Sequence, residues 1–378
     1  MCIYCVSIYQ LSNWRWRIML KINHVKPHLS LDRWKRIGDV EGKNSEVWIA
    51  RDTQLEQVLI LKKITKQSLE QQAVEDYFAE AKILNTSKHP HIMPIFYSAE
   101  DAENVYITMP YYATGSLNTL LDQRFLTTRE IIRYSLDFLS GLLFIHIKGL
   151  IHLDIKPTNV IIDDTNKAIL TDFGLSKYLD ENGFANQGRQ YVAHRPPEAY
   201  VTSDKTVQSD IYQAGLTLYR MCNGNFDFET QFELLKTECK SDAEFIKRIH
   251  KSEFPNRKSY LPHIPAKLCR IINKMLHTDI DKRYQDVLSI INDLSKIDEK
   301  MDWQYDIIEQ ERTFEWKLEN GNSVVTVRIE GDNDQFLTSV KKYGKSSKKT
   351  QNQPRFSKKN DTLLEALAHV ETILPQYS

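Results

Sequence analysis

The sequence predicts an α+β fold in which a small β-rich lobe precedes a larger helical lobe, with a small β-β-β-α domain after them. Residues 34–64 hold two apolar, β-branched runs around a glycine-containing turn, which is typical of strands. From about residue 128, apolar residues recur at helical spacing, and after residue 302 alternating runs return. Two lobes of this kind leave a cleft between them, where we expect the functional site.

These changes of pattern set the expected domain boundaries. Residues 1–30 contain four basic residues and no acidic one, and we expect a disordered N-terminal extension there. The β-rich lobe is expected over residues 31–110 and the helical lobe over 111–300. Residues 303–378 are expected to form the third unit.

Within the first lobe, residues 70–85 read as a helix with apolar side chains on one face, and 89–96 and 104–112 read as short strands. In the helical lobe, the apolar residues of the first helix are spaced four, three and four apart: Ile132, Leu136, Leu139 and Leu143. Residues 160–170 predict a hairpin with a polar turn, and 210–300 are mostly helical.

The C-terminal unit begins with two alternating runs around Asn320-Gly321-Asn322, a strong hairpin signal. Residues 334–340 predict a third strand, and 361–374 predict an amphipathic helix capped by Asp361 or Thr362. Residues 341–359 carry eight basic residues and no acidic one. We expect a solvated, mobile loop there, with nucleic-acid binding as the less favoured alternative.

Composition excludes several classes of protein. Fifty basic residues balance fifty acidic ones, so net charge does not indicate a nucleic-acid partner. Five cysteines, an odd number in a long chain, favour a reducing compartment, and the C-x-x-C at Cys2 and Cys5 lacks the second pair that a zinc site needs. No stretch has the length of a transmembrane span, and we expect a cytoplasmic protein.

The segment HLDIKPTN, residues 152–159, concentrates chemically active side chains. Asp154 and Asp172 lie eighteen residues apart, and the hairpin predicted between them would return both carboxylates to one site. Two carboxylates and the amide of Asn159 suit magnesium, which prefers carboxylate and phosphate oxygens. Lys156 adds a cation for phosphate charge, so the cluster indicates phosphoryl transfer.

An ordered set of motifs resembles the protein-kinase superfamily, specifically the eukaryotic-like (Hanks-type) Ser/Thr kinases. HLDIKPTN resembles the catalytic loop and TDFG the metal-binding motif. LILKKI resembles the third strand with its lysine, FAEAKIL the following helix, and MPYYATGSL the hinge. RPPE, SDIYQAGLTLY and DIDKRYQD follow in the family's order, so the resemblance covers about residues 31–298.

The resemblance implies a bilobal protein-kinase fold and a role for each matched residue. It makes Asp154 the group that positions and deprotonates the substrate hydroxyl, and Lys156 the cation that steadies the transferring phosphoryl group. It makes Asn159 and Asp172 the ligands of Mg²⁺. It places ATP against these residues: Gly42, Val47, Lys62, Glu80, Met109, Tyr112, Lys156, Asn159 and Asp172.

Supporting contacts are implied as well. Glu80 would hold Lys62, Asp210 would buttress the catalytic loop, and Arg283 would pair with Glu198. Pro110 follows the gatekeeper position Met109 and lacks an N–H, but the family uses only a carbonyl there. The next donor to adenine is the N–H of Tyr112. His152 is expected to be a packed structural residue near Phe173, without chemistry of its own.

The sequence departs from the family in its glycine-rich loop. The three glycine positions fall on Val40, Gly42 and Ser45, so only one is glycine. Glycine lets the backbone approach phosphate, and its loss is the reason to weigh a pseudokinase.

A second departure lies at the catalytic aspartate. Leu153 replaces the arginine that in this family binds a phosphate on the activation segment, and leucine cannot bind phosphate. Between Phe173 and Pro197 the hydroxyl-bearing residues are Ser176, Tyr178 and Tyr191. Our hypothesis is that activity does not depend on phosphorylation of this segment. Tyr191 and His194 also stand where the family has threonine and tyrosine, so the resemblance supports the nucleotide chemistry more directly than the acceptor residue type.

The sequence therefore predicts an ATP- and Mg²⁺-dependent Ser/Thr protein kinase that acts on a protein substrate and can autophosphorylate. The alternatives are a pseudokinase scaffold that binds nucleotide or a partner without transfer, and a kinase that acts on a small molecule.

Overall fold

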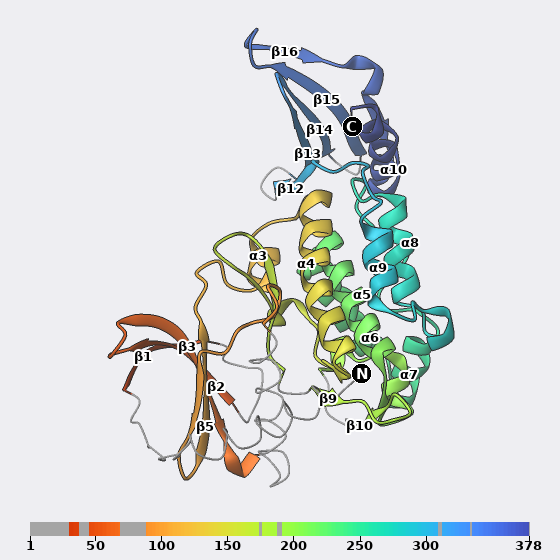
Figure 1. Ribbon diagram of the computed structural model, residues 1–378. Helices are drawn as coiled ribbons and strands as arrows, with labels where there is room; N and C mark the ends of the chain where they lie inside the picture. The colour runs from red at the N-terminus through yellow and green to blue at the C-terminus, as the bar shows by residue number, and fades with distance from the viewer. Residues whose placement is uncertain are drawn as a thin grey trace, which may run out of the picture.

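The computed structural model describes most of the chain after residue 29 (Figure 1). The described ranges are 30–37, 45–68, 88–173, 176–186, 191–308, 312–332 and 335–377. Four expectations lie outside the described residues: the N-terminal extension up to residue 29, Gly42, the helix expected over 70–85, and Glu80 on that helix.

The first lobe is a five-stranded antiparallel sheet in the order β1-β2-β3-β5-β4. Its strands are β1 (Leu31–Ile37), β2 (Ser45–Asp52), β3 (Gln57–Thr65), β4 (Tyr97–Glu100) and β5 (Asn104–Pro110). The strand expected over 89–96 is wrong: only Ile92 forms an isolated bridge, and β4 begins at Tyr97. Pro90 and Pro94 lack the N–H that a strand ladder needs.

The second lobe is helical, as expected. Its helices are α3 (Leu117–Gln123), α4 (Thr128–Ile147), α5 (Val207–Asn223), α6 (Asn225–Glu238), α7 (Asp242–His250), α8 (Ala266–Met275) and α9 (Val287–Leu294). Helix α4 begins with a capping box in which Thr127 and Glu130 satisfy each other's backbone N–H groups. Its stripe of buried residues packs with α5, α8 and α9 into the largest apolar core of the described residues.

Short elements between α4 and α5 carry the candidate site. They are β6 (Leu150–Ile151), the 3₁₀ turn η2 (Pro157–Asn159), β7 (Val160–Ile162), β8 (Ala168–Leu170), β9 (Lys177–Tyr178), β10 (Ala185–Asn186), η3 (Val192–His194), η4 (Pro197–Tyr200) and β11 (Asp204–Lys205). The hairpin expected over 160–170 is confirmed as β7–β8. Its polar turn includes Asn166, which adopts a left-handed conformation with φ of 62°.

The C-terminal unit has more strands than the three predicted. A six-stranded sheet in the order β12-β13-β14-β15-β16, with β17 beside β15, packs against helix α10. Its elements are β12 (Gln304–Ile308), β13 (Thr313–Asn320), β14 (Ser323–Asp332), β15 (Gln335–Gly344), β16 (Lys349–Asn352), the turn η7 (Pro354–Phe356), β17 (Lys358–Asn360), α10 (Leu363–Ile373) and the turn η8 (Leu374–Gln376).

The prediction of a loop over residues 341–359 is therefore wrong. Much of this exposed basic run forms the end of β15, all of β16 and part of β17. The sequence KTQN of β16 has no apolar alternation, because every one of its side chains is exposed at the sheet edge. The hairpin around Gly321 and the helix capped by Thr362 are confirmed.

The C-terminal unit is docked on the end of the helical lobe, away from β1–β5 (Figure 1). Tyr305 meets Phe125 edge-on, with 4.6 Å between ring centroids. Trp316 Nε1 donates a hydrogen bond of 3.4 Å to Nδ1 of His263, a fully buried residue of the helical lobe. Phe125 and Leu261 thereby join the apolar core of the C-terminal sheet. Among the described residues, no helix is both long enough and apolar enough to cross a membrane.

Candidate functional site

A buried carboxylate from α5 fixes the backbone of the segment that contains HLDIKPTN. Asp210 Oδ2 accepts the N–H of His152 at 2.7 Å, and Oδ1 accepts the N–H of Leu153 at 2.7 Å. His146 Nε2 lies 2.8 Å from the same carboxylate. Asp210 is fully buried, so these charge-assisted bonds act in a low-dielectric interior and hold the loop firmly.

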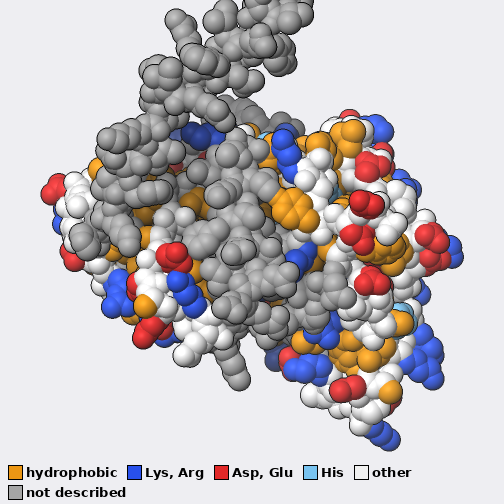
Figure 2. Space-filling view, turned by 60° about the horizontal axis from the view of Figure 1, so that its bottom comes forward, with side chains coloured by type: hydrophobic (Ala, Val, Ile, Leu, Met, Phe, Trp, Pro, Cys, Tyr) orange, Lys and Arg blue, Asp and Glu red, His pale blue; other side chains and the backbone are white. Residues whose placement is uncertain are grey.

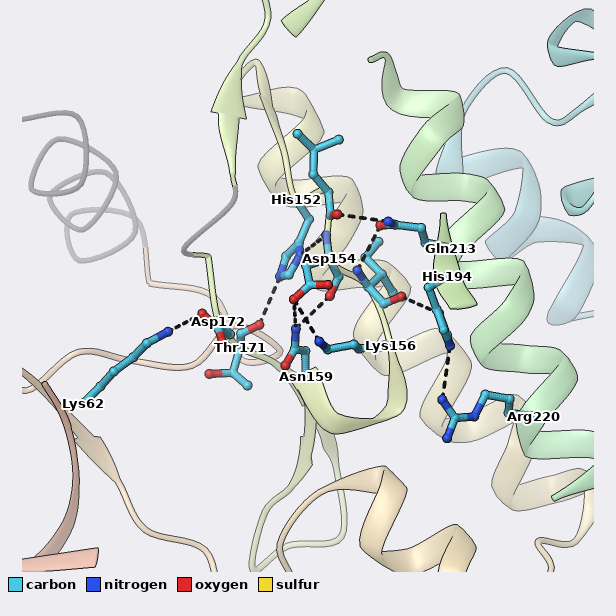
Figure 3. Close-up of polar contacts among 12 residues, drawn as sticks. Lys62, His152, Asp154, Lys156, Asn159, Thr171, Asp172, His194, Gln213 and Arg220 are labelled. Carbon is cyan, nitrogen blue, oxygen red and sulfur yellow. Dashed lines mark hydrogen bonds and ion pairs between the residues drawn. The ribbon is translucent and has the colours of Figure 1, made fainter. Parts of the chain in front are cut away.

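The same helix supplies a second clamp, one turn further along. Gln213 Nε2 donates to the carbonyl of Leu153 at 2.9 Å, and its Oε1 accepts the N–H of Ile155 at 3.0 Å (Figure 3). The carbonyl of Ile155 meets Nδ1 of His194 at 3.0 Å. The backbone on both sides of Asp154 is therefore tied to side chains from other elements.

Asp154 has one engaged and one unengaged carboxylate oxygen. Its Oδ2 accepts from Asn159 Nδ2 at 2.8 Å and lies 3.3 Å from Lys156 Nζ (Figure 3). Its Oδ1 is buried and has no hydrogen-bond partner among the described residues. Burial raises the pKa of Asp154, Lys156 opposes that shift, and Asp172 adds to it. An orphaned acceptor of this kind needs a donor, and a raised pKa makes it a better base.

Asn159 and Asp172 have atoms suited to a magnesium ion. Asn159 Nδ2 donates to both the carbonyl and Oδ2 of Asp154, which directs the amide so that its Oδ1 is left as the acceptor. Asp172 adopts a left-handed conformation with φ of 62°, an uncommon one for a residue other than glycine. In the described part of the chain, no group of three or more His, Cys, Asp or Glu residues could hold a metal alone. One amide oxygen, one carboxylate and phosphate oxygens together fit Mg²⁺, which prefers such mixed sets.

Lys62 connects the two lobes at this point. It lies on β3 opposite Val47 of β2, and only 9% of it is exposed. Its ammonium group forms an ion pair with Asp172 Oδ1 (Figure 3). Four residues predicted from the sequence thus lie around one region between the lobes: Lys62, Asp154, Asn159 and Asp172 (Figure 3).

The remaining residues predicted to contact nucleotide lie at the end of β5. Met109 pairs with Ile60 and Pro110 with Leu59, so Pro110 is accommodated at the end of the β3–β5 ladder. Tyr112 lies two residues after Pro110 and is half-buried, and burial raises the pKa of its hydroxyl. The chain then turns into α3, which places Met109 and Tyr112 at the junction of the two lobes.

Leu153 occupies an apolar cluster rather than a phosphate site. It is fully buried, with φ of 67°, and clusters with Ile151 and Ala185. Leu179 and Val207 pack against the same cluster. Leu179 and Ala185 belong to the segment after Asp172, so the cluster fastens that segment to the catalytic loop through apolar burial.

His152 packs near Phe173, as predicted. Its Nε2 lies 3.0 Å from the carbonyl of Thr171, and its ring packs 4.8 Å from that of Phe173. Complete burial lowers the pKa of His152, because the charged form would lose its hydration.

A buried ion pair closes the far end of the segment. Arg283 makes two parallel bonds to Glu198, of 2.9 Å to Oε1 and 2.7 Å to Oε2. The guanidinium group also lies over the ring of Tyr212 at 4.8 Å. The pairing implied by the motifs RPPE and DIDKRYQD is therefore present.

Two features of the site were not found from the sequence. Gln213 clamps the loop backbone, and Arg220 contacts His194 Nε2 at 3.2 Å and Asn118 Oδ1 at 2.8 Å. Both residues are buried polar residues on α5, in the motif SDIYQAGLTLY and just beyond it. A polar residue on the apolar face of a helix was the available signal, since such groups are usually hydrogen-bonded.

Comparison with known proteins agrees with this geometry. Residues 32–293 match the family model described as the protein kinase domain. The serine/threonine-protein kinase PknD of Protochlamydia amoebophila is 26% identical over 309 residues, which cover 71% of this chain and 30% of that protein.

Two further relatives give similar values. A probable serine/threonine-protein kinase PknB of Lactococcus lactis is 28% identical over 270 residues, 70% of this chain and 42% of the relative. The serine/threonine-protein kinase ULK3 of Xenopus laevis is 29% identical over 234 residues, 60% of this chain and 47% of the relative. The chain therefore spans less than half the length of these curated relatives.

Proposed function

The chain belongs to the protein kinase family, and on this premise we propose that it transfers the γ-phosphate of ATP to a serine or threonine hydroxyl of a protein substrate. The observation that carries the proposal is the unengaged, buried Oδ1 of Asp154. A substrate hydroxyl would supply the donor that this oxygen lacks, and Asp154 could then take the proton.

The proposed transfer forms one bond to phosphorus and breaks another. The acceptor oxygen forms a bond to the γ-phosphorus, and the bond from that phosphorus to the bridging oxygen breaks. ADP leaves with the electron pair, and the hydroxyl proton goes to Asp154. Asn159 and Asp172 would hold Mg²⁺, which when bound neutralises the charge on the phosphate oxygens.

Lys62 and Lys156 divide the remaining charge. Lys62 stands on β3 at the side of the first lobe, where it would contact the inner phosphates. Lys156 is 3.3 Å from Asp154 Oδ2 and would follow the transferring group. The two cations would therefore neutralise different parts of the triphosphate, which is what positioning and charge stabilisation require.

The test is to incubate the purified chain with labelled ATP and Mg²⁺, beside an Asp154→Asn control, and to map phosphorylated residues by mass spectrometry. We expect label on serine or threonine in the first sample, from autophosphorylation or an added peptide library, and none above background in the second. Nucleotide binding without transfer would favour the scaffold alternative, and mapped tyrosine would overturn the acceptor assignment.

We further propose that this activity does not require a phosphorylated activation segment. The support is the apolar cluster of Leu153, Ala185 and Leu179, which fastens the segment without a phosphate. Of the hydroxyls available between Phe173 and Pro197, that of Ser176 is buried and faces the carbonyl of His152 at 3.4 Å.

The matching experiment is a triple variant, Ser176→Ala, Tyr178→Phe and Tyr191→Phe, in which no activation-segment hydroxyl remains. We expect it to keep kcat within about threefold of the wild type, because apolar burial persists. Loss of activity in a triple variant that is still folded would overturn this part of the proposal.

A further inference from the structure

Tyr191 lies against the catalytic loop with its ring facing a lysine. Lys156 Nζ is over this ring, 4.9 Å from the ring centroid. The same ammonium group is 3.3 Å from Asp154 Oδ2. An aromatic face attracts an ammonium ion through the negative charge above and below the ring. Lys156 therefore has an anionic oxygen and an aromatic face as neighbours.

The ring of Tyr191 has a fixed neighbour of its own. His194 lies 5.9 Å from it between centroids, and His194 is fully buried. Arg220 can only donate, so Nε2 of His194 must accept from it and Nδ1–H must donate to the carbonyl of Ile155. Burial keeps the pKa of His194 well below its usual value, so the ring stays neutral in this role.

We propose that Tyr191 is a positioning residue for Lys156. The aromatic face of Tyr191 keeps the ammonium group of Lys156 beside Asp154 during phosphoryl transfer. The inference rests on the proposed kinase activity. Tyr191 is 41% exposed whereas Lys156 is 7% exposed, so the ring contacts solvent far more than the cation does. The ring and not the hydroxyl carries this role, because the attraction acts through the ring face.

The experiment compares two variants. Tyr191→Phe keeps the aromatic ring, whereas Tyr191→Leu removes the ring and keeps an apolar side chain. Steady-state kinetics are measured with a peptide that the wild type phosphorylates in the mass-spectrometry experiment above. We expect Tyr191→Leu to lower kcat by about three- to thirtyfold and Tyr191→Phe to stay within about twofold. The KM for ATP should change by less than about twofold in both, because Lys156 is proposed to act on the transferring phosphoryl group and an interaction made in the transition state affects kcat rather than KM.

Phe184→Leu is the matched control, since Phe184 is another exposed aromatic residue of the same segment, with no assigned role in the site. It should keep wild-type kcat. The decisive step is a double-mutant cycle with Lys156→Met, in which adding Tyr191→Leu should cause no further loss of kcat.

A Tyr191→Leu variant as active as the wild type overturns the inference, as does a Tyr191→Phe variant that loses as much as Tyr191→Leu. Additive losses in the cycle also overturn it, because the ring would then act through another group. A wild type with no more label than Asp154→Asn overturns the proposed activity as well, which separates the two failures.

Discussion

The carboxylate of Asp210 accepts the backbone N–H of Leu153 at 2.7 Å, and Leu153 holds a left-handed backbone with φ of 67°. A leucine in that conformation carries a cost of about 1–2 kcal/mol, which the surrounding structure must offset. The bond from Asp210 and the burial of the leucine side chain both do so. The backbone strain next to Asp154 is thus maintained by two separate interactions.

Replacing Asp210 by asparagine should release this arrangement. The amide keeps one acceptor oxygen, so either the N–H of His152 or that of Leu153 loses its acceptor, and the other keeps only a neutral one. A buried unsatisfied group costs about 1–3 kcal/mol, and we expect urea unfolding to show a loss of that size with a large fall in kcat. Asp279→Asn, at an exposed cap that asparagine serves as well, is the control and should change stability by under about 0.5 kcal/mol. Equal effects of the two variants would contradict the assigned role.

The ion pair between Arg283 and Glu198 should contribute strongly to the free energy of unfolding of the helical lobe. Arg283→Met leaves a buried carboxylate without its cation, so we expect a loss of about 3–5 kcal/mol in the free energy of unfolding. Arg129→Met removes an exposed pair with Asp302 and should cost less than about 1 kcal/mol. Denaturant titration of both variants measures the two losses in the free energy of unfolding. A loss below about 1 kcal/mol for Arg283→Met would show that Arg283 and Glu198 do not form this ion pair in solution.

The C-terminal sheet should contribute to the stability of the kinase lobe. Tyr305 is buried at the interface, where it contacts Phe125 and His263. Tyr305→Ala should therefore cost about 3 kcal/mol, in the range for buried aromatic residues, and should lower the melting temperature of the whole chain. Tyr343→Ala removes an exposed ring of the same sheet and should cost under about 0.5 kcal/mol. A C-terminal unit that melts separately, with the kinase lobe unchanged in Tyr305→Ala, would show two independent units.

The sequence allowed part of the arrangement of the candidate site to be predicted, because residues close together in the chain set that part. A hairpin between Asp154 and Asp172 returns the chain on itself, and Asn159 ends the 3₁₀ turn η2, five residues after Asp154. Contacts that join distant segments gave no such signal. The ring of Tyr191 reaches Lys156 only through the path of the activation segment, and no periodicity encodes that path.

The C-terminal sheet shows a different limit. The hairpin around Gly321 could be predicted because turn residues stand between alternating runs. Strand β16 could not, since an edge strand exposed on both faces needs no apolar residue and reads as a loop. Backbone pairing with β15, a tertiary effect, decides its structure.

Acid should weaken the interface through His263. Burial lowers the pKa of His263 to about 4, and its Nδ1 must remain unprotonated to accept from Trp316. The folded pKa lies below the unfolded value of about 6.5, so the unfolded chain binds more protons between these two values. The contribution of His263 to stability is therefore complete above about pH 6.5 and falls as the pH drops toward 4. From pH 7 to pH 5 the loss should be about 2 kcal/mol.

The measurement is the free energy of unfolding at both pH values for the wild type and for His263→Asn, whose amide oxygen can still accept from Trp316. Other titrating groups affect both proteins equally, so the difference between the two pH dependences isolates His263. We expect the variant to lose about 2 kcal/mol less than the wild type on acidification. Parallel pH dependences would mean that His263 takes up a proton in the folded protein near its ordinary pKa, which would require water to reach the interface between Trp316 and the helical lobe.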